Sequence, residues 1–564
     1  MKRVFFALAL SAALASPALA ASNDKLDAPP PGITPTTATL AQVLKAYDAA
    51  KGHLAPGAAD TRQEAWTFTK AGMAGTETLV RSGLDYYSRI VRGPFVDEYG
   101  QFFGHGWHRG PNGVVSPVSS PQYTSFEMLL FMRNLDDAAD PKNDVTVLGE
   151  VQTPKPAYVL QIKPSGGKHP EFAFYDKQTG LIDRFDFVVD DTRTTTMYDD
   201  YRTTDGLTAP WHVHFTDGTA PLDYDFVRTS LTIGKSIDAK QFAIPSSTFG
   251  FVYYNGEQSL PVNIYTDSWM LNIGSNRYHM VHSPTVIVRL NVGGRGLDFA
   301  LSAAQPRSLI DFEVAQELHL SSYGQVIHAN GSDVSYDTVI PQADWGSQLL
   351  LRNWAVRATP FHYHLKEGTK IVGVIGYDVL SSGVFKTDYD NARMSVFPPS
   401  AFDTPAPEVK NAATIPISID SGLPFFTGFV ANHETPNILF DNAFELSLIF
   451  GDFTSEYPDA VKDAVTGQTH AVTMIPFADS TGYGKDVHVW LGQVPDLNFG
   501  PAHFMNFPIL ASNATIDFGP HDVDAVMGGD LLKYYDVYLD YPHNRIFLRP
   551  NNTFFRVFQF EPQK

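Results

Sequence analysis

Apolar and polar residues alternate along much of the segment 60–245, and short turn-forming clusters separate the alternating runs. One pair of runs flanks the turn 176–180, and a second pair flanks the turn 204–206. Strict alternation sends successive side chains to opposite faces of a strand, so each pair predicts a β-hairpin. The runs together predict an antiparallel sheet, curved or half-closed. The apolar members of the two hairpins are Phe172, Phe174, Leu181, Phe185, Phe187, Met197, Tyr198, Tyr201, Trp211, Val213 and Phe215.

A helical period precedes this sheet and predicts one helix packed against it. Gly52 follows the periodic residues as a stop signal. The stretch before the helix, residues 21–36, is rich in proline and predicts a mobile linker. The residues that fall at i, i+3, i+4 and i+7 of the helix are Leu40, Val43, Leu44 and Tyr47.

The remainder of the chain, from about residue 250 onwards, contains an internal repeat. An apolar run with a glycine, a short helical pattern and an Asp-Tyr turn occur at 374–393 and again at 526–545. Upstream, an apolar strand ends before Ser302 in the first copy and before Asp441 in the second, and Ser-Leu-Ile follows each. The agreement predicts two copies of one structural unit.

Composition and the N-terminus narrow the class of protein. Lys2 and Arg3, an apolar run and Ala18-Leu19-Ala20 have the layout of a secretory signal peptide at residues 1–20. No later segment is apolar for the length of a membrane-spanning helix, so we expect no transmembrane segment after signal cleavage and a location in the periplasm or outside the cell. The net charge of -20 argues against nucleic acid as a partner. The 564 residues include no cysteine, which excludes disulfides and thiolate metal sites.

The sheet-forming segment resembles the lipoprotein carriers, whose fold is a half-barrel with an apolar concave face. The resemblance implies this fold and a possible lipid or apolar ligand for the N-terminal domain. It rests on the segments 104–107, 111–113, 200–202, 205–207 and 209–211.

Each repeat copy resembles one lobe of the retropepsin-like aspartic peptidases, in the exported bacterial form with two lobes in one chain. In that family an apolar strand delivers Asp-Thr-Gly, and an apolar strand ending in glycine crosses beside it. Gly376 and Gly528 occupy that glycine position. The resemblance implies a mainly β fold with a cleft between two lobes, and an ancestral endopeptidase activity on polypeptide.

The catalytic positions implied by this resemblance are altered. Cleavage by the family needs two carboxylates that share one proton. The second copy supplies Asp441, followed by Asn442 and Ala443 in place of Thr and Gly. The first copy has Ser302, followed by Ala303 and Ala304. A serine hydroxyl cannot carry the second negative charge, so the sequence predicts a degenerate peptidase that binds a peptide or extended ligand in the cleft.

Other candidate sites are weaker. His212 and His214 share a strand face, as do His362 and His364. Such pairs can bind a metal, but no third ligand is near in sequence, so we expect polar histidines and no metal or cofactor. Glu445 lies close after Asp441, although the backbone would aim it differently.

The sequence thus predicts a mainly β protein: an N-terminal half-barrel antiparallel sheet with one helix, then two retropepsin-like lobes. Whether it is an enzyme stays open. One alternative to the degenerate module is an active aspartic endopeptidase that uses Asp441, and another is a periplasmic carrier of an apolar ligand. The expected boundaries are a signal peptide at 1–20, a linker at 21–36, the carrier-like domain at 37–248, lobe 1 at 249–399, a linker at 400–413 and lobe 2 at 414–564.

Overall fold

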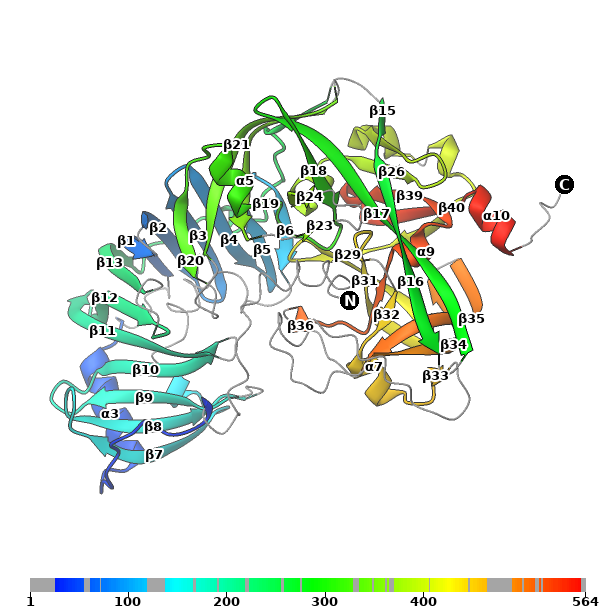
Figure 1. Cartoon of the computed structure of the whole chain (residues 1–564). Coiled ribbons are helices and arrows are strands. Elements are labelled where there is room, and N and C mark those ends of the chain that lie inside the picture. Colours follow the sequence, from blue (N-terminus) through cyan, green and yellow to red (C-terminus); the bar gives the residue numbers. More distant parts are fainter. Residues whose placement is uncertain are drawn as a thin grey trace.

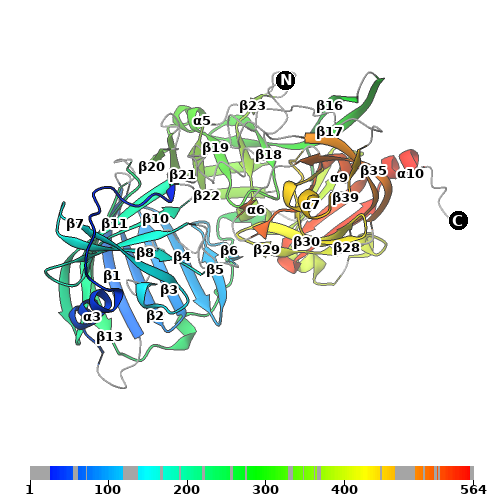
Figure 2. The same cartoon turned by 90° about the horizontal axis from the view of Figure 1, so that it is seen from below.

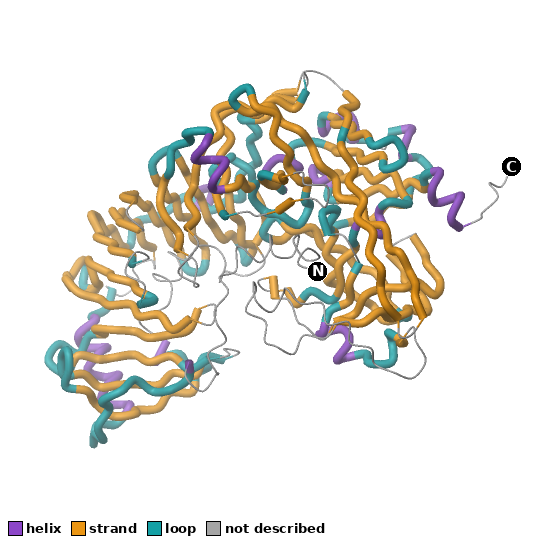
Figure 3. Tube along the Cα trace, in the orientation of Figure 1, coloured by secondary structure: helices purple, strands orange, loops and turns teal. Residues whose placement is uncertain are grey.

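Strands dominate the protein in the computed structural model (Figure 3), which confirms the prediction of a mainly β fold. The predicted signal peptide lies outside the described residues. The structure describes residues 26–54, 61–70, 73–118, 137–165, 169–189, 192–218, 223–254, 258–273, 276–327, 334–346, 349–360, 363–364, 370–404, 406–444, 447–463, 489–499, 502–512, 517–518 and 521–558.

The first sheet is antiparallel and contains 13 strands within the described residues, in the order β6-β5-β4-β3-β2-β1-β13-β12-β11-β10-β9-β8-β7. It forms the curved array on the left of Figure 1. The hairpins predicted around 176–180 and 204–206 are confirmed as β9–β10 and β11–β12. The strands are β1 Thr61–Lys70, β2 Met73–Ser82, β3 Asp85–Arg92, β4 Phe95–Phe102, β5 His105–Arg109, β6 Val115–Val118, β7 Asp144–Val151, β8 Ala157–Lys163, β9 Glu171–Asp176, β10 Ile182–Val189, β11 Thr192–Thr204, β12 Leu207–Thr216 and β13 Tyr224–Ile233.

Helix α3 (Leu40–Lys51) packs on one face of this sheet, which we call the helix face, and it confirms the predicted helix. Thr39 caps its N-terminus with a reciprocal bond to Gln42, and Gly52 ends it at a φ of 71°. Val43 and Tyr47 are buried because they meet the aromatic side chains of the sheet, with the Tyr47 ring edge-on to Tyr175 of β9 at 5.4 Å. Burial of this apolar stripe stabilises the helix on the sheet.

Part of the segment predicted to be a mobile linker is bound to the sheet. Thr34 and Glu150 of β7 exchange two backbone hydrogen bonds, at 2.9 and 2.8 Å. Ile33 packs against the cluster that contains Val151 and Phe172. The backbone pairing is long-range in sequence, so the local proline content gave no sign of it.

Two further sheets carry the repeat copies. Among the described residues, the second sheet has nine strands and the third sheet has eight. The second sheet contains β14 Val252–Tyr254, β16 Asn263–Ile273, β17 Asn276–Val292, β18 Arg295–Leu301, β19 Leu309–Asp311, β20 Tyr323–Ile327, β21 Val334–Trp345, β22 Leu349–Thr359 and β25 Gly373–Ile375. The third sheet contains β29 Ser418–Asp420, β30 Leu423–Val430, β31 His433–Phe440, β32 Leu448–Ile449, β33 Lys462–Asp463, β34 Val489–Phe499, β35 Ala502–Ser512 and β38 Ala525–Met527.

The strand pairings of the two copies correspond, which confirms the internal repeat. In the first copy β25 runs parallel to β18 and antiparallel to β19, and β19 runs parallel to β22. In the second copy β38 runs parallel to β31 and antiparallel to β32, and β32 runs parallel to β35. Short helices follow the equivalent strands, α6 (Tyr377–Leu380) after β25 and α9 (Gly529–Leu532) after β38. The same local pattern has therefore folded in the same way twice.

A joining sheet links the copies by pairing a strand of the first with one of the second. β26 (Val384–Asp388) is antiparallel to β39 (Tyr535–Asp540), with Lys386 opposite Tyr538. Its other strands are β15 Gln258–Pro261, β27 Arg393–Phe397, β28 Ala413–Pro416 and β40 Arg545–Pro550. The remaining elements are α5 Phe312–Glu317, α7 Gly451–Glu456, α10 Asn552–Phe558, β23 Tyr363–His364, β24 Lys370–Ile371, β36 Asp517–Phe518, β37 His521–Asp522, and the 3₁₀ turns η2 Asp137–Ala139, η4 Ala239–Gln241, η5 Pro399–Phe402, η6 Pro407–Val409 and η7 Tyr541–His543.

The first sheet is fixed to the second by buried polar contacts. The Asn112 amide, in the turn between β5 and β6, donates to the Ala355 carbonyl and to Asp378, while its oxygen accepts from the Ala355 N–H. Figure 2 shows β5 and β6 at the side of the first sheet that faces α6. No helix formed by the described residues is long and apolar enough to cross a membrane. The boundaries expected from the sequence stay predictions.

Candidate functional site

The structure brings Ser302 and Asp441, the two positions singled out from the sequence, into direct contact. The Ser302 hydroxyl donates to Asp441 Oδ1 at 3.0 Å, and both residues are buried. The backbone N–H groups of Ala443 and Ala304 also donate to the Asp441 carboxyl. Burial raises the pKa of Asp441 to about 6 although these three donors favour its charged form.

Asn442 holds the two copies together beside this contact. Its side-chain oxygen accepts from the Ala303 N–H at 2.8 Å, and its amide donates to the Leu301 carbonyl at 3.1 Å. The Tyr541 hydroxyl donates to the carbonyl of Ala303 at 2.7 Å. These bonds satisfy backbone groups that would otherwise be buried without partners. We call the set formed by Ser302, Asp441 and Asn442 the junction.

Matched bonds fix the glycine strands under the junction. The Ser308 hydroxyl donates to Asp378 and accepts from the Gly376 N–H. In the second copy, the Ser447 hydroxyl donates to Asp530 and accepts from the Gly528 N–H. Gly376 is needed because an added Cβ would lie 2.2 Å from the Gln305 carbonyl oxygen.

The junction joins the two copies by hydrogen bonds, and we call this structural role the brace. A hydroxyl and a carboxyl meet where an aspartic mechanism needs two carboxyls, so the junction cannot divide the roles of acid and base between two such groups. Glu445 lies outside the described residues. The roles predicted for Ser302 and Asp441 stay predictions, whereas their contact is a structural fact.

The histidine pair of β12 lies in an ionic chain on the face opposite α3. His212 bonds to Asp199 at 2.9 Å and to Asp225 at 3.2 Å, and His214 bonds to Asp225 at 2.8 Å. No group of three or more side chains that could hold a metal occurs in the described part of the chain. The side chains of His362 and His364 lie outside it.

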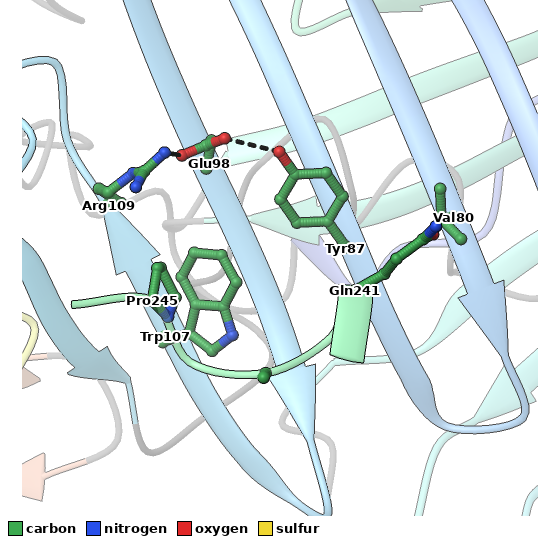
Figure 4. A pocket seen from close by; sticks show the side chains of 8 residues that line it. Val80, Tyr87, Glu98, Trp107, Arg109, Gln241 and Pro245 are labelled. Atoms are coloured by element: carbon green, nitrogen blue, oxygen red, sulfur yellow. Dashed lines mark hydrogen bonds and ion pairs between the residues drawn. The ribbon is translucent and has the colours of Figure 1, made fainter. Parts of the chain in front are cut away.

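A pocket of about 480 Å³ lies on the same face of the first sheet, away from α3 (Figure 4). Val80 on β2 is opposite Tyr87 on β3, Tyr87 is opposite Gly100 on β4, and Gly100 is opposite Trp107 on β5. Opposite residues share a face of a sheet, so these side chains form one row. The segment 241–245 lies over the row and closes the pocket with Gln241, Ala243 and Pro245.

Gly100 makes room for the indole ring of Trp107. A Cβ at this position would lie 2.5 Å from two carbon atoms of the ring. The Trp107 ring therefore lies over the glycine, and its N–H donates to the Phe242 carbonyl at 3.3 Å. The Tyr87 ring lies 6.2 Å from it. The result is an aromatic wall inside the pocket.

A charged group forms the other end of the pocket. Glu98 is buried, accepts a 2.6 Å bond from the Tyr87 hydroxyl and pairs with Arg109. Arg89 lies 3.8 Å from the same carboxylate. Burial and the bond to Glu98 raise the pKa of Tyr87 well above its usual value, so Tyr87 stays protonated. Two guanidinium groups face one carboxylate, which leaves one excess positive charge.

Sequence reasoning found Trp107 only as part of the segment 104–107 and did not find the pocket. The register of β2 and β3, which puts Val80 and Tyr87 on one face, is seen in the structure. The closing segment 241–245 is more than 130 positions away from Trp107 along the chain, and no local pattern indicates that it returns to the sheet.

No protein-family model and no curated protein matches the chain. A DUF1329 family protein from Desulfovibrio piger aligns at 17% identity and a TM-score of 0.29, over 36% of this chain and 95% of that one. A LolA superfamily protein from Nitrosomonas europaea aligns at 12% identity and a TM-score of 0.27, over 37% and 98%. Conglutin gamma, a basic 7S globulin from lupine seeds, aligns at 9% identity and a TM-score of 0.30, over 55% and 97%.

These matches correct the family that the sequence predicted for the repeat. They include a DUF1329 family protein and a LolA superfamily protein, and none of them is described as an aspartic peptidase. The assignment to retropepsin-like peptidases, and with it proteolysis, was therefore wrong, and a peptide ligand is not supported. The residues that suggested this family, such as Ser308 and Gly376, form a hydrogen bond that holds two crossing strands together. Their recurrence reports the packing of a β unit and not its chemistry.

Proposed function

We propose that this protein is an exported binding protein for a single-chain amphiphile, held in the pocket of the first sheet. The observation that carries the proposal is the row of Val80, Tyr87 and Trp107, in which Gly100 leaves room for the Trp107 ring, with Glu98 and Arg109 at its end. An apolar chain would lie along the row, where its burial is favourable. The pocket volume falls in the range of small-molecule sites.

The charged end selects the polar group of the ligand. The Glu98 carboxylate is already bonded to Tyr87 and Arg109, so the excess charge there is positive. An anionic head group such as a carboxylate gains a charge-assisted bond from a guanidinium, and an alcohol of the same chain length gains less. The signal-peptide pattern of residues 1–20 supports an exported location for this binding.

Calorimetric titration with decanoate and decanol tests the proposal. Ala243 is exposed and lines the pocket, so Ala243→Trp fills the pocket without disturbing the core. Ala239 is exposed and does not line it, so Ala239→Trp is the matched control. We expect decanoate to bind the wild type and the control alike, and the Ala243→Trp variant at least about tenfold more weakly. Equal affinity in all three proteins would overturn the pocket assignment.

A triple variant tests the head-group assignment separately. Arg89→Gln, Glu98→Gln and Arg109→Gln together remove both guanidinium groups and the carboxylate, so no excess positive charge remains and no buried charge is left without a partner. The wild type should prefer decanoate over decanol by about tenfold or more, because a bond to a charged group is stronger than one to a neutral group. The triple variant should lose this preference and keep its affinity for decanol. A preference that survives would place the head group elsewhere.

A further inference from the structure

Two neighbouring turns at one end of the first sheet expose large apolar side chains. Leu84 lies in the β2–β3 turn and is 80% exposed, and Phe103 lies in the β4–β5 turn and is 76% exposed. These are the two highest exposed fractions of large apolar side chains in the described part of the chain. We call Leu84 and Phe103 the apolar tips.

Hydrogen bonds hold the two tips side by side. The Phe103 N–H donates to Asp85 Oδ1 at 2.9 Å, and the Gln101 amide donates to the Leu84 carbonyl at 3.3 Å. Figure 1 shows strands β2 to β5 adjacent and in sequence order. The rings of Phe102 and Phe103 lie 4.3 Å apart. The tips therefore form one apolar surface of fixed geometry.

Phe103 is also an unfavourable residue for its backbone conformation. Its φ is 50°, in the left-handed region that glycine, asparagine and aspartate adopt most readily. A phenylalanine here costs conformational free energy, and its exposed ring adds an apolar area in contact with water. Single exposed apolar residues are ordinary, but two on bonded turns, one of them strained, call for a partner.

We propose that the apolar tips dock this protein onto a zwitterionic lipid surface. A stable protein partner would need about 1,000 Å² of interface, whereas two turn apices offer only protruding side chains that can enter a bilayer one by one. Phenylalanine and leucine side chains are typical of apolar faces that enter the head-group region of a membrane. Asp85, the acidic residue beside both tips, is bonded to the Phe103 N–H. The net charge of -20 disfavours an anionic surface.

Docking in this way would bring the pocket close to the lipid head groups. Val80 lies four residues before Leu84 and Tyr87 three after it, which is about 10–13 Å along extended strands. Trp107 lies four residues after Phe103. An amphiphile leaving the surface would meet the pocket directly. The docking proposal rests on the tips alone and holds even if the pocket binds nothing.

Flotation with phosphatidylcholine vesicles tests the docking. The variants are Leu84→Ser with Phe103→Ser, and Met505→Ser as the matched control, because Met505 is 65% exposed on β35. We expect the wild type and the control to float with the vesicles. The double variant should partition at least about tenfold less, because both apolar side chains are lost. Phosphatidylglycerol vesicles should bind the wild type less well than phosphatidylcholine vesicles.

Three results would overturn the proposal: no flotation of the wild type, equal flotation of the double variant, or loss of flotation in the Met505→Ser control. Sedimentation of the wild type without lipid tests whether the tips instead bind a second copy of the chain. Self-association that the double variant abolishes would assign the tips to that second copy. Decanoate titration of the double variant distinguishes the two sites. Unchanged decanoate affinity with lost flotation supports docking as a separate function of the tips.

Discussion

The Ser302 hydroxyl lies 3.0 Å from Asp441 Oδ1 and donates a hydrogen bond to it across the boundary between the second and third sheets. The bond joins equivalent positions of the two repeat copies. One copy contributes a carboxyl group and the other a hydroxyl, so this contact between the copies contains one acidic group.

The stability of the protein should depend on the protonation of Asp441. Because burial raises its pKa to about 6, the folded protein holds this proton more tightly than the unfolded chain does. As the pH rises from about 4 to about 6, the free energy of unfolding should therefore fall, by up to about 3 kcal/mol from this group. Urea unfolding of the wild type and Asp441→Asn across this range measures the contribution, which the variant should lack. Parallel pH profiles would contradict it.

Asn442 should be the most sensitive residue of the junction. Asn442→Ala removes both of its bonds and leaves the Ala303 N–H and the Leu301 carbonyl buried without this partner. We expect a loss of about 2–4 kcal/mol in the free energy of unfolding. Asn263 is exposed, so Asn263→Ala is the control and should change stability by less than about 0.5 kcal/mol. Similar midpoints in urea for both variants would count against the brace.

The charged cluster around Asp97 on the first sheet should be sensitive to acid. Burial opposes the ionisation of Asp97, but His108, Arg92 and Arg307 hold its pKa well below the usual value. Its stabilisation is therefore present above about pH 4 and is lost as the pH falls towards the folded-state pKa. Asp97→Asn should lower stability at pH 7 by about 3 kcal/mol, with the difference from the wild type shrinking below about pH 4.

An exposed acid serves as the control for that comparison. Asp459 is exposed, and Asp459→Asn should leave the acid profile unchanged. Chemical unfolding of the three proteins at pH 7 and pH 3 gives the comparison. A constant gap between the wild type and Asp97→Asn at both values would show that the charge of Asp97 is not the cause.

Gly100 should control the shape of the pocket. The added methyl group of Gly100→Ala would meet the Trp107 ring at 2.5 Å, so the ring has to move. We expect a loss of about 1–3 kcal/mol in stability and weaker decanoate binding. Gly110 has room, since the nearest atom to an added Cβ is 3.6 Å away, and Gly110→Ala should change neither. Decanoate binding by Gly100→Ala at wild-type strength would show that the ring position is unimportant.

Short-range patterns predicted a large part of this fold. The i, i+3, i+4, i+7 spacing gave helix α3, and alternation around the turn 204–206 gave the β11–β12 hairpin. The repeat gave the correspondence between Gly376 and Gly528. It also gave the meeting of Ser302 with Asp441, because equivalent positions of two facing copies come together. In the helix and the hairpin, residues close in sequence determine the structure.

The long-range features could not be predicted in the same way. The pairing of Thr34 with Glu150 and the return of segment 241–245 to the sheet depend on contacts between distant segments. The family predicted for the repeat was wrong because it relied on residues such as Ser447, which hold two crossing strands together. These residues recur in both copies although only one copy has an aspartate at the matched position. The site on the first sheet depends on contacts between strands, since the position of the Trp107 ring is set by Gly100 on the neighbouring strand.

The crystal structure of a complex with 10-bromodecanoate tests the central claim most directly, because the anomalous signal of bromine locates the end of the chain. The account predicts a bromine peak beside Val80, at the opposite end of the row from Trp107, with the carboxylate towards Arg109 (Figure 4). A peak elsewhere on the molecule, or no bound bromine at saturating ligand, would contradict the assignment of this pocket as the binding site.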